Sequence, residues 1–316
     1  MNSMGQSPLH LTATCILQAG SSGIAPNTTA LVNPYGFPME IHEIKWQIRT
    51  GDVNYRPLGA STGCSFTLGS VKLTNGFVPN NLFCKSTGMT AGTGSNVNQN
   101  LAAEEITDPT ANFWNQFSWR LPVPLYVPPG AVLVPKFEHR NLLPSDLNIT
   151  ISYTGTTLPM AFRPKRILVP WVAYWAAKTI LLSAADSDNS QETDLANTWP
   201  ESINIQRMVG RTLLLRNSSG WVSEDGNFGD YQSDLLQVRI VRSDGHHIVP
   251  EFSRWSMVFP HQRRSWEMRD AIMAPNSFMM AFIQKAASAN AGGGGAADQL
   301  TTQSMMSIVG WREVGT

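Results

Sequence analysis

The sequence predicts an all-β protein whose two halves are similar and follow one another along the chain. Short alternating or β-branched runs, separated by clusters of Gly, Pro, Asn and Ser, extend over its whole length. A chain of 316 residues is long enough for two domains that each bury a core. A matching pair of Pro-containing segments, one in each half, supports this division. We therefore expect domains at residues 1–160 and 161–316.

The strand candidates place apolar side chains mostly on one face, as strands that cover a core do. In the first half these segments are Leu9–Cys15, Glu40–Ile48 and Asn148–Tyr153. In the second half they are Val209–Leu215, Leu235–Val241, Phe278–Ile283 and Met305–Trp311. The segment Ala176–Trp199 is ambiguous. One short helix is expected at Asp108–Phe117, with Asp108 as its cap and Pro109 at its first position.

An internal repeat is the most informative feature of the sequence. Tyr126–Val134 can be aligned with Ile272–Met280, which places Pro129 on Pro275 and the turn residue Gly130 on Asn276. Because proline is tolerated at the first residue of a strand, both prolines are expected to begin equivalent strands.

Two further expectations follow from the repeat. Val132 and Phe278 should point the same way in their two halves. The closing strands Asn148–Tyr153 and Ser307–Trp311 should each pair within their own half. Near the starts, Ala30–Pro34 matches Leu213–Ser218 in type, each an apolar strand ended by Asn, and a Pro-rich join at Leu158–Pro164 separates the halves.

Composition points to self-association. Only 15% of the residues are charged, well below the roughly 25% of an average soluble protein. Low surface charge weakens repulsion between copies, and the ten Trp and thirteen Met are residue types that packed interfaces favour. The 23 basic and 23 acidic residues balance, so a sequence-specific nucleic-acid partner is not expected. The basic group His261, Arg263, Arg264 and Arg269 is interpreted as a solvated or interface strand.

Two low-complexity segments, Ser86–Asn100 and Ala286–Ala297, are expected to form exposed loops. Neither ends in the Gly-Lys-Ser/Thr pattern of a phosphate-binding loop. The first residues, Met1–Pro8, lack the pattern of a secretory signal, and the most apolar run, Ile167–Ala177, is too short to span a bilayer. The three sequons, at Asn27, Asn148 and Asn217, are interpreted as chance products of an Asn/Thr-rich sequence.

No catalytic, cofactor or metal site is predicted, and the chain is not expected to be an enzyme. The motifs H-E-x-x-H and C-x-x-C are absent from the sequence. His246–His247 follows the turn-forming pair Asp244–Gly245, which favours the tip of a hairpin over a metal site. The odd number of cysteines, Cys15, Cys64 and Cys84, predicts buried or half-buried thiols and no disulfide framework.

Two acidic groups are candidates for cation sites. Glu104, Glu105 and Asp108 lie beside a low-complexity segment and are interpreted as solvated. The second group, Asp186, Asp188, Glu192 and Asp194, begins like a calcium loop. However, Gln191 stands where that loop needs glycine, and Asn197 stands where it needs its last Glu.

The chain resembles the double jelly-roll major capsid proteins. The resemblance rests on two tandem β-sandwich halves, the Asn33–Pro38 turn, the openings at Pro129 and Pro275, and the lack of a catalytic set. Among them, it is most similar to the small capsid proteins of lipid-containing icosahedral bacteriophages, such as the single-stranded-DNA phage that infects Flavobacterium. The resemblance implies two tandem eight-stranded jelly-roll sandwiches and no cofactor.

The resemblance also implies a function and a set of partners. Three copies would form a pseudo-hexameric trimer, and these capsomers would build an icosahedral shell around a membrane and genome. Neighbouring capsomers, minor capsid or vertex proteins and an internal viral membrane are therefore the expected partners. The protein would be made in the host cytoplasm and located in the virion.

Two other functions remain open at this point. The first is a carbohydrate-binding or glycan-processing tandem jelly-roll protein, in which Trp114, Trp119, Trp171 and Trp175 would stack on sugars. The second is a minor virion or tail component, since such proteins share the β-rich, low-charge composition.

Overall fold

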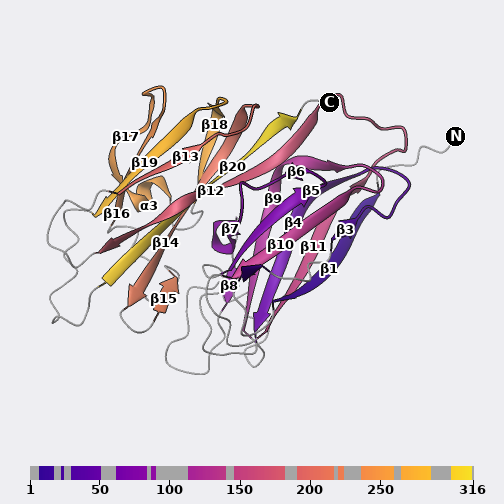
Figure 1. Ribbon diagram of the computed structural model, residues 1–316, viewed down its shortest axis with the longest axis horizontal. Coiled ribbons are helices and arrows are strands. Elements are labelled where there is room, and N and C mark those ends of the chain that lie inside the picture. Colours follow the sequence, from indigo (N-terminus) through magenta and orange to yellow (C-terminus); the bar gives the residue numbers. More distant parts are fainter. Residues whose placement is uncertain are drawn as a thin grey trace.

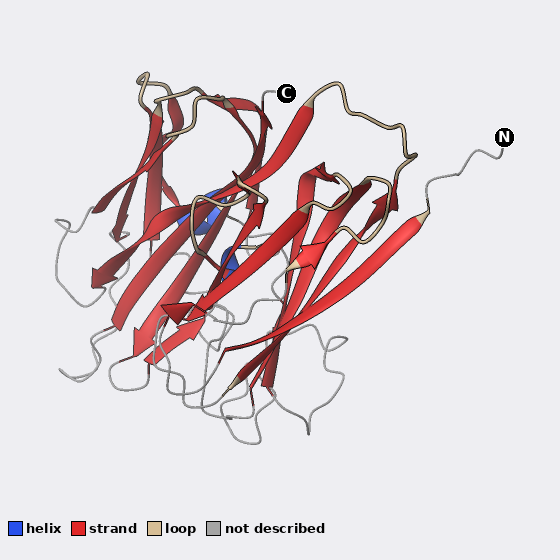
Figure 2. Ribbon diagram, turned by 45° about the vertical axis from the view of Figure 1, so that its right-hand side comes forward, coloured by secondary structure: helices blue, strands red, loops and turns tan. Residues whose placement is uncertain are grey.

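The structure is a computed structural model, and it describes twelve stretches of the chain. They are residues 7–17, 23–24, 30–50, 62–83, 87–89, 113–139, 146–181, 191–216, 220–223, 236–259, 265–285 and 300–314. In these stretches nearly all residues are in strands (Figure 2). The expected loop Ala286–Ala297, the acidic group Glu104, Glu105 and Asp108, and Asp186 with Asp188 lie outside them.

The first half is a sandwich of two antiparallel sheets. One sheet has the order β1 (Pro8–Leu17), β11 (Leu147–Thr157), β4 (Met39–Thr50), β9 (Phe113–Val127) and β8 (Thr87–Met89). The other has the order β2 (Gly23–Ile24), β10 (Val132–His139), β5 (Thr62–Leu68) and β6 (Val71–Lys72). In this second sheet β3 (Leu31–Val32) also pairs with β10, and β7 (Val78–Pro79) pairs with β5. The short 3-10 helix η1 (Asn80–Leu82) follows β7.

The second half is a second sandwich. Its first sheet has the order β12 (Ile167–Leu181), β20 (Leu300–Val314), β14 (Ile203–Arg216) and β15 (Gly220–Ser223), and β18 (Ser265–Met273) pairs with β14. Its other sheet has the order β13 (Gln191–Ala196), β19 (Phe278–Lys285), β16 (Leu236–Arg242) and β17 (His247–Arg254). The short helix α3 (Trp255–Val258) follows β17.

The two sandwiches repeat one topology. The sheet order β1-β11-β4-β9 of the first half recurs as β12-β20-β14-β18, and β10-β5-β7 recurs as β19-β16-β17. Each closing strand, β11 or β20, pairs with two strands of its own half. This order, in which the last strand lies beside the first in one sheet, is that of a jelly roll. The fold is therefore a double jelly roll, which confirms the predicted fold class.

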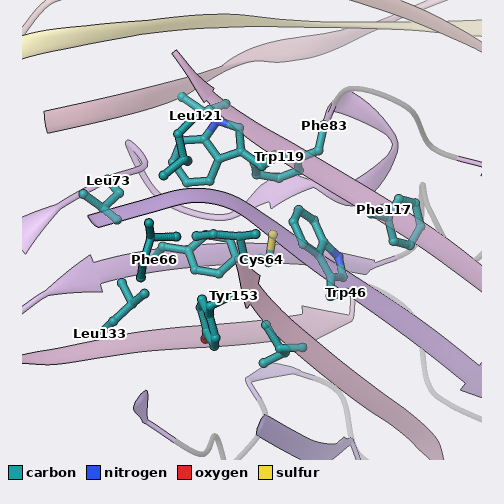
Figure 3. Packing of buried hydrophobic residues seen from close by; sticks show 14 of the residues in the cluster. Trp46, Cys64, Phe66, Leu73, Phe83, Phe117, Trp119, Leu121, Leu133 and Tyr153 are labelled. Atoms are coloured by element: carbon teal, nitrogen blue, oxygen red, sulfur yellow. The ribbon is translucent and has the colours of Figure 1, made fainter. Parts of the chain in front are cut away.

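Each half has an aromatic-rich core. In the first half Trp46 packs against Phe66, Phe83 and Phe117, which Figure 3 shows around it. Phe137 also contacts Trp46, and the four ring centroids lie 4.8 to 6.4 Å from that of Trp46. The core of the second half contains three buried tryptophans, Trp171, Trp175 and Trp255. Burial of these large side chains is the main favourable contribution to the stability of each sandwich.

The alternation read from the sequence accounts for β11. Leu147, Ile149 and Ile151 are buried, whereas Asn148 and Thr150 between them are exposed. Successive side chains of a strand point to opposite faces, so one face of β11 enters the core and the other is left for solvent or a partner.

The Pro-containing repeat is confirmed, with one shift in position. The N–H groups of Ala131 and Ser277 donate to the carbonyls of Pro128 and Ala274. Gly130 and Asn276 both have positive φ, 72° and 57°. Pro129 and Pro275 therefore occupy the second position of equivalent turns, where the fixed φ of proline fits, and the strands begin three residues later.

Val132 and Phe278 are the first residues of β10 and β19, as the repeat predicts, but neither is in the core. The residues after them, Leu133 and Met279, are buried. The sheet faces are therefore equivalent, with the buried position one residue further along than expected.

Three sequence expectations are wrong. The part of the expected helix Asp108–Phe117 that is described, from Phe113 on, belongs to β9, which pairs along β4. Thr87–Met89, the described part of the expected loop Ser86–Asn100, forms β8, and the rest of that loop lies outside the described residues. Leu213–Leu215 lies in β14 and pairs with β15 and β20, so it is not equivalent to Leu31–Val32, which pairs with β10.

Candidate functional site

A buried asparagine joins the turns at one end of the first sandwich. The side-chain Nδ2 of Asn33 donates to the carbonyl oxygens of Phe37, Val127 and Pro128, each at 3.1 Å. Its Oδ1 accepts the N–H of Tyr35 at 3.0 Å. One side chain thus ties the turn after β3 to the turn between β9 and β10.

Asn197 does the same in the second sandwich. Its Nδ2 donates to the carbonyl oxygens of Glu201, Met273 and Ala274 at 3.0 to 3.1 Å, and its Oδ1 accepts the N–H of Trp199 at 3.1 Å. Sequence reasoning identified the turn at Asn33 but missed its counterpart. The shared pattern of an Asn followed two residues later by an aromatic ring, Tyr35 or Trp199, was the available signal.

The two sandwiches are joined by main-chain pairing (Figure 1). The N–H of Asn75 donates to the carbonyl oxygen of Val172 at 3.2 Å, and the N–H of Val172 donates to the carbonyl oxygen of Leu73 at 3.0 Å. The Asn75 side chain also exchanges two hydrogen bonds with the backbone of Tyr174, at 2.9 and 3.2 Å. The join therefore has a specific register.

An apolar contact extends this join. Val209, Met305 and Val309, on the outer face of the sheet β12-β20-β14, are buried in the core cluster of the first half. The hydroxyl of Ser307, on the same face, donates to the carbonyl of Leu82 at 3.2 Å. One face of this sheet therefore covers its own core, and the other covers the first sandwich.

Arg312 is a buried cation at the same interface, with an exposed fraction of 3%. Its guanidinium donates to Glu201 at 3.1 Å and to the carbonyl of Lys72 at 3.2 Å, and lies 4.1 Å from the centroid of the Trp199 ring. Burial lowers the pKa of Arg312, although the Glu201 carboxylate opposes this shift. The side chain thus connects the second sandwich to the first, a role that sequence reasoning did not identify.

The residues weighed for metal or acid chemistry are dispersed in the described stretches. His246 and His247 are exposed at a hairpin tip, as predicted. In this turn the N–H of Gly245 donates to the carbonyl oxygen of Arg242, and Gly245 has a φ of 80°. Glu192 and Asp194 lie on β13. Within the described residues, no group of three His, Cys, Asp or Glu side chains could hold a metal ion. The basic residues His261, Arg263 and Arg264 lie outside these residues, whereas Arg269 is on β18.

The described cysteines are buried thiols, as predicted. Burial raises the pKa of Cys15 to about 12 and raises that of Cys64 well above its usual value. Both are free, and Cys84 lies outside the described residues. These thiols fill space in the first core and are held in the unreactive neutral form.

The aromatic side chains proposed for sugar stacking are mostly unavailable to a ligand. Trp119, Trp171 and Trp175 are each at most 3% exposed and belong to the cores. Trp114 lies on β9, and its side chain is not among those described. Where the chain is described, no helix is long and apolar enough to cross a membrane.

The apolar side chains that do reach the surface are few, in the part of the chain that is described. Met257 is 76% exposed and Met160 is 71% exposed. Ile272 and Phe278 border a half-open cavity of about 340 Å³ at one end of the second sandwich, beside Arg242 and His246.

Similarity to solved structures extends over the whole chain. The PBCV-1 virus capsid matches with a TM-score of 0.51 and 8% identity, over 100% of this chain and 97% of that one. The PBCV-1 VP54 crystal structure fitted into a reconstruction of the virophage Sputnik matches with a TM-score of 0.50 and 9% identity, with the same coverage. No protein-family model and no curated protein matches the sequence. At such low identity the likeness establishes the class of fold, the double jelly roll.

Proposed function

We propose that this protein is a structural major capsid protein that self-assembles as pseudo-hexameric trimers into an icosahedral virion shell. The observation that carries the proposal is the duplication of one jelly roll within a chain, with the copies locked together by a buried interface. The full-length likeness of the fold to the PBCV-1 capsid supports the same function.

The geometry of a shell explains why such a duplication is useful. A chain with two similar blocks places six blocks around the axis of a trimer, and six similar blocks can tile a near-hexagonal lattice. A fixed angle between the blocks is needed for this, and the hydrogen bonds of Asn75 and Arg312 across the join supply it.

The remaining parts of the proposal concern partners and location. Neighbouring capsomers, minor capsid or vertex proteins and an internal viral membrane are the proposed partners, and the virion is the proposed location after synthesis in the host cytoplasm. Residues 1–160 and 161–316 are the proposed units. We propose no catalytic, cofactor or metal site and no sequence-specific nucleic-acid binding.

Light scattering of the purified protein at micromolar concentration tests the proposal. We expect a trimer at neutral pH and moderate salt. A clean monomer under these conditions would count heavily against a shell-forming role. The number of copies in purified particles distinguishes a major capsid protein, which must be abundant, from a minor virion component.

A further inference from the structure

The two short helices in the described stretches, η1 and α3, occupy equivalent places. In the first half Val78 of β7 pairs with Cys64, and in the second half Ser253 of β17 pairs with Val238. Cys64 and Val238 in turn pair with equivalent residues of β10 and β19. Leu82 lies four residues after Val78, at the end of η1, and Met257 lies four residues after Ser253, in α3. Leu82 and Met257 are therefore equivalent positions.

The surroundings of these two residues differ. Leu82 has an exposed fraction of 0%, and its carbonyl accepts the hydroxyl of Ser307 from the outer face of β20. The β14 and β20 strands of the second half lie against η1. Met257, in contrast, is 76% exposed. Among the described residues, the first half thus has a cover over Leu82 that the second half lacks over Met257.

The repeat identifies the surface that would provide this cover. The counterparts of β12, β20 and β14 are β1, β11 and β4, whose outer face covers no other element in the described part of the chain. Two glycines lie at equivalent bulges of these strands. Gly155 of β11 approaches the backbone carbonyl of Glu40, and Gly310 of β20 approaches that of Asn204. Ser152 and Ser307 each lie three residues before these glycines.

We propose that the α3 surface around Met257 of one copy docks on the outer face of β1-β11-β4 of a second copy. In this contact Ser152 of the second copy lies over Met257 of the first, as Ser307 lies over Leu82 within one chain. The proposal rests on the self-association proposed above and specifies which surfaces meet. The contact joins two different surfaces, the α3 surface and the outer face of β1-β11-β4, and each copy carries both. Repetition of this contact from copy to copy forms a ring if the rotation closes.

The chemistry of the two faces fits this division. The face that is covered within the chain presents Val209, Met305 and Val309. The counterpart face of the first half presents Thr150 and Thr154 at the positions equivalent to Met305 and Val309, and the charged Lys45 at the position equivalent to Val209. A face that must stay soluble before assembly is expected to be more polar than one that is covered during folding, as non-obligate interfaces generally are.

A pair of introduced cysteines tests the contact. In the double variant Met257→Cys with Ser152→Cys, oxidation is expected to link subunits covalently, whereas neither single variant should do so. Asn148→Cys, which is exposed on the same strand β11 but four residues away, paired with Met257→Cys is the matched control and should link much less. A dimer from Met257→Cys alone would overturn the proposal, since it would require a contact between two copies of α3.

A charge substitution gives a second readout. Met257→Asp should reduce the trimer fraction at least tenfold at micromolar concentration while leaving the unfolding midpoint of the isolated subunit unchanged, because the side chain is exposed in the single subunit. Met160→Asp is the control, because Met160 is similarly exposed but lies in the Pro-rich segment Leu158–Pro164; this variant should not affect assembly. Trimers that persist in Met257→Asp, without the 152–257 link in the cysteine variants, would refute this interface and leave the capsid proposal standing. A parent protein that never forms trimers would contradict both.

Discussion

Asn33 and Asn197 are small polar side chains that satisfy backbone groups buried at the ends of the two sandwiches. Each donates to three carbonyl oxygens and accepts one N–H, so four main-chain groups lose a partner if the amide is removed. A buried group without a partner incurs the full cost of its lost hydration. The same arrangement in both halves indicates a structural requirement of this jelly roll.

Replacement of either asparagine by alanine should therefore be strongly destabilising. We expect Asn33→Ala and Asn197→Ala each to lower the free energy of unfolding by about 1–3 kcal/mol, because the side-chain hydrogen bonds that hold the turns together are lost, including a buried one to Val127 or Met273. Asn148→Ala, at an exposed site on β11, is the control. Urea unfolding followed by tryptophan fluorescence gives the comparison. Equal midpoints for the three variants would show that the buried amides do not fasten the turns.

Arg312 provides a second test with a matched control. Its side chain is 4% exposed in its pair with Glu201, whereas the Arg166–Glu313 pair is exposed on both sides. Loss of one partner of a buried pair typically costs about 3–5 kcal/mol, and loss of an exposed pair costs about 1 kcal/mol or less. We expect Arg312→Ala to lower the unfolding midpoint clearly, and Arg166→Ala to leave it nearly unchanged. Similar midpoints in the two variants would contradict the role of Arg312 at the join.

At the scale of the strands, each sandwich needs a glycine where the closing strand crosses a bulge. A Cβ on Gly155 would collide with the Glu40 carbonyl oxygen, and one on Gly310 would collide with that of Asn204. These atoms belong to the backbone of a paired strand, so they cannot move aside cheaply. Close approach of two backbones is a recognised reason for glycine inside a strand.

The bulge predicts a large effect from a small substitution. Gly155→Ala and Gly310→Ala should each destabilise the protein by about 3 kcal/mol or more, since they overpack a paired sheet. Gly36→Ala is a suitable control, because a Cβ there meets nothing within 4 Å, and it should change stability by less than about 0.5 kcal/mol. Thermal unfolding of the four proteins compares them. A stable Gly155→Ala variant would mean that the two strands do not approach as closely as described.

The elements differ in how well the sequence predicts them. Alternating segments such as Asn148–Tyr153 and the Pro129/Pro275 turns are local signals, and the structure agrees with them. Phe113–Phe117 was assigned to a helix because of Asp108 and Pro109, but pairing along β4 overrides this local preference. The match of Ala30–Pro34 to Leu213–Ser218 failed for a related reason: two strands of similar composition can lie in different sheets, and composition does not reveal pairing.

The buried interface was harder to predict than the fold. A single Arg at the end of an apolar strand and an exposed Met on a four-residue helix carry no local signal of their partners. Arg312 meets the Lys72 carbonyl only because the two sandwiches are in contact, and it meets Glu201 through the folding of its own half. The equivalence of Met257 and Leu82 likewise becomes visible only through the pairing of β7 and β17 with their neighbours.

On the scale of the whole molecule, the duplication gives one chain two blocks with one topology but different surfaces. The outer face of β12-β20-β14 is apolar and covered, whereas its counterpart in the first half is more polar and is not covered by the other described elements. In the proposed assembly each copy thus offers one surface of each kind. This combination is what a subunit needs if it is to assemble after synthesis.

Electron microscopy of particles from the source, reconstructed far enough to place strands, tests the central claim most directly. The account predicts a shell whose repeating capsomer is a ring of six jelly-roll blocks contributed by three copies of this chain. Each copy should contribute β12-β20-β14 to a contact within the chain and β1-β11-β4 to a contact between chains. A shell built by another protein, with this chain absent or present in only a few copies, would contradict it.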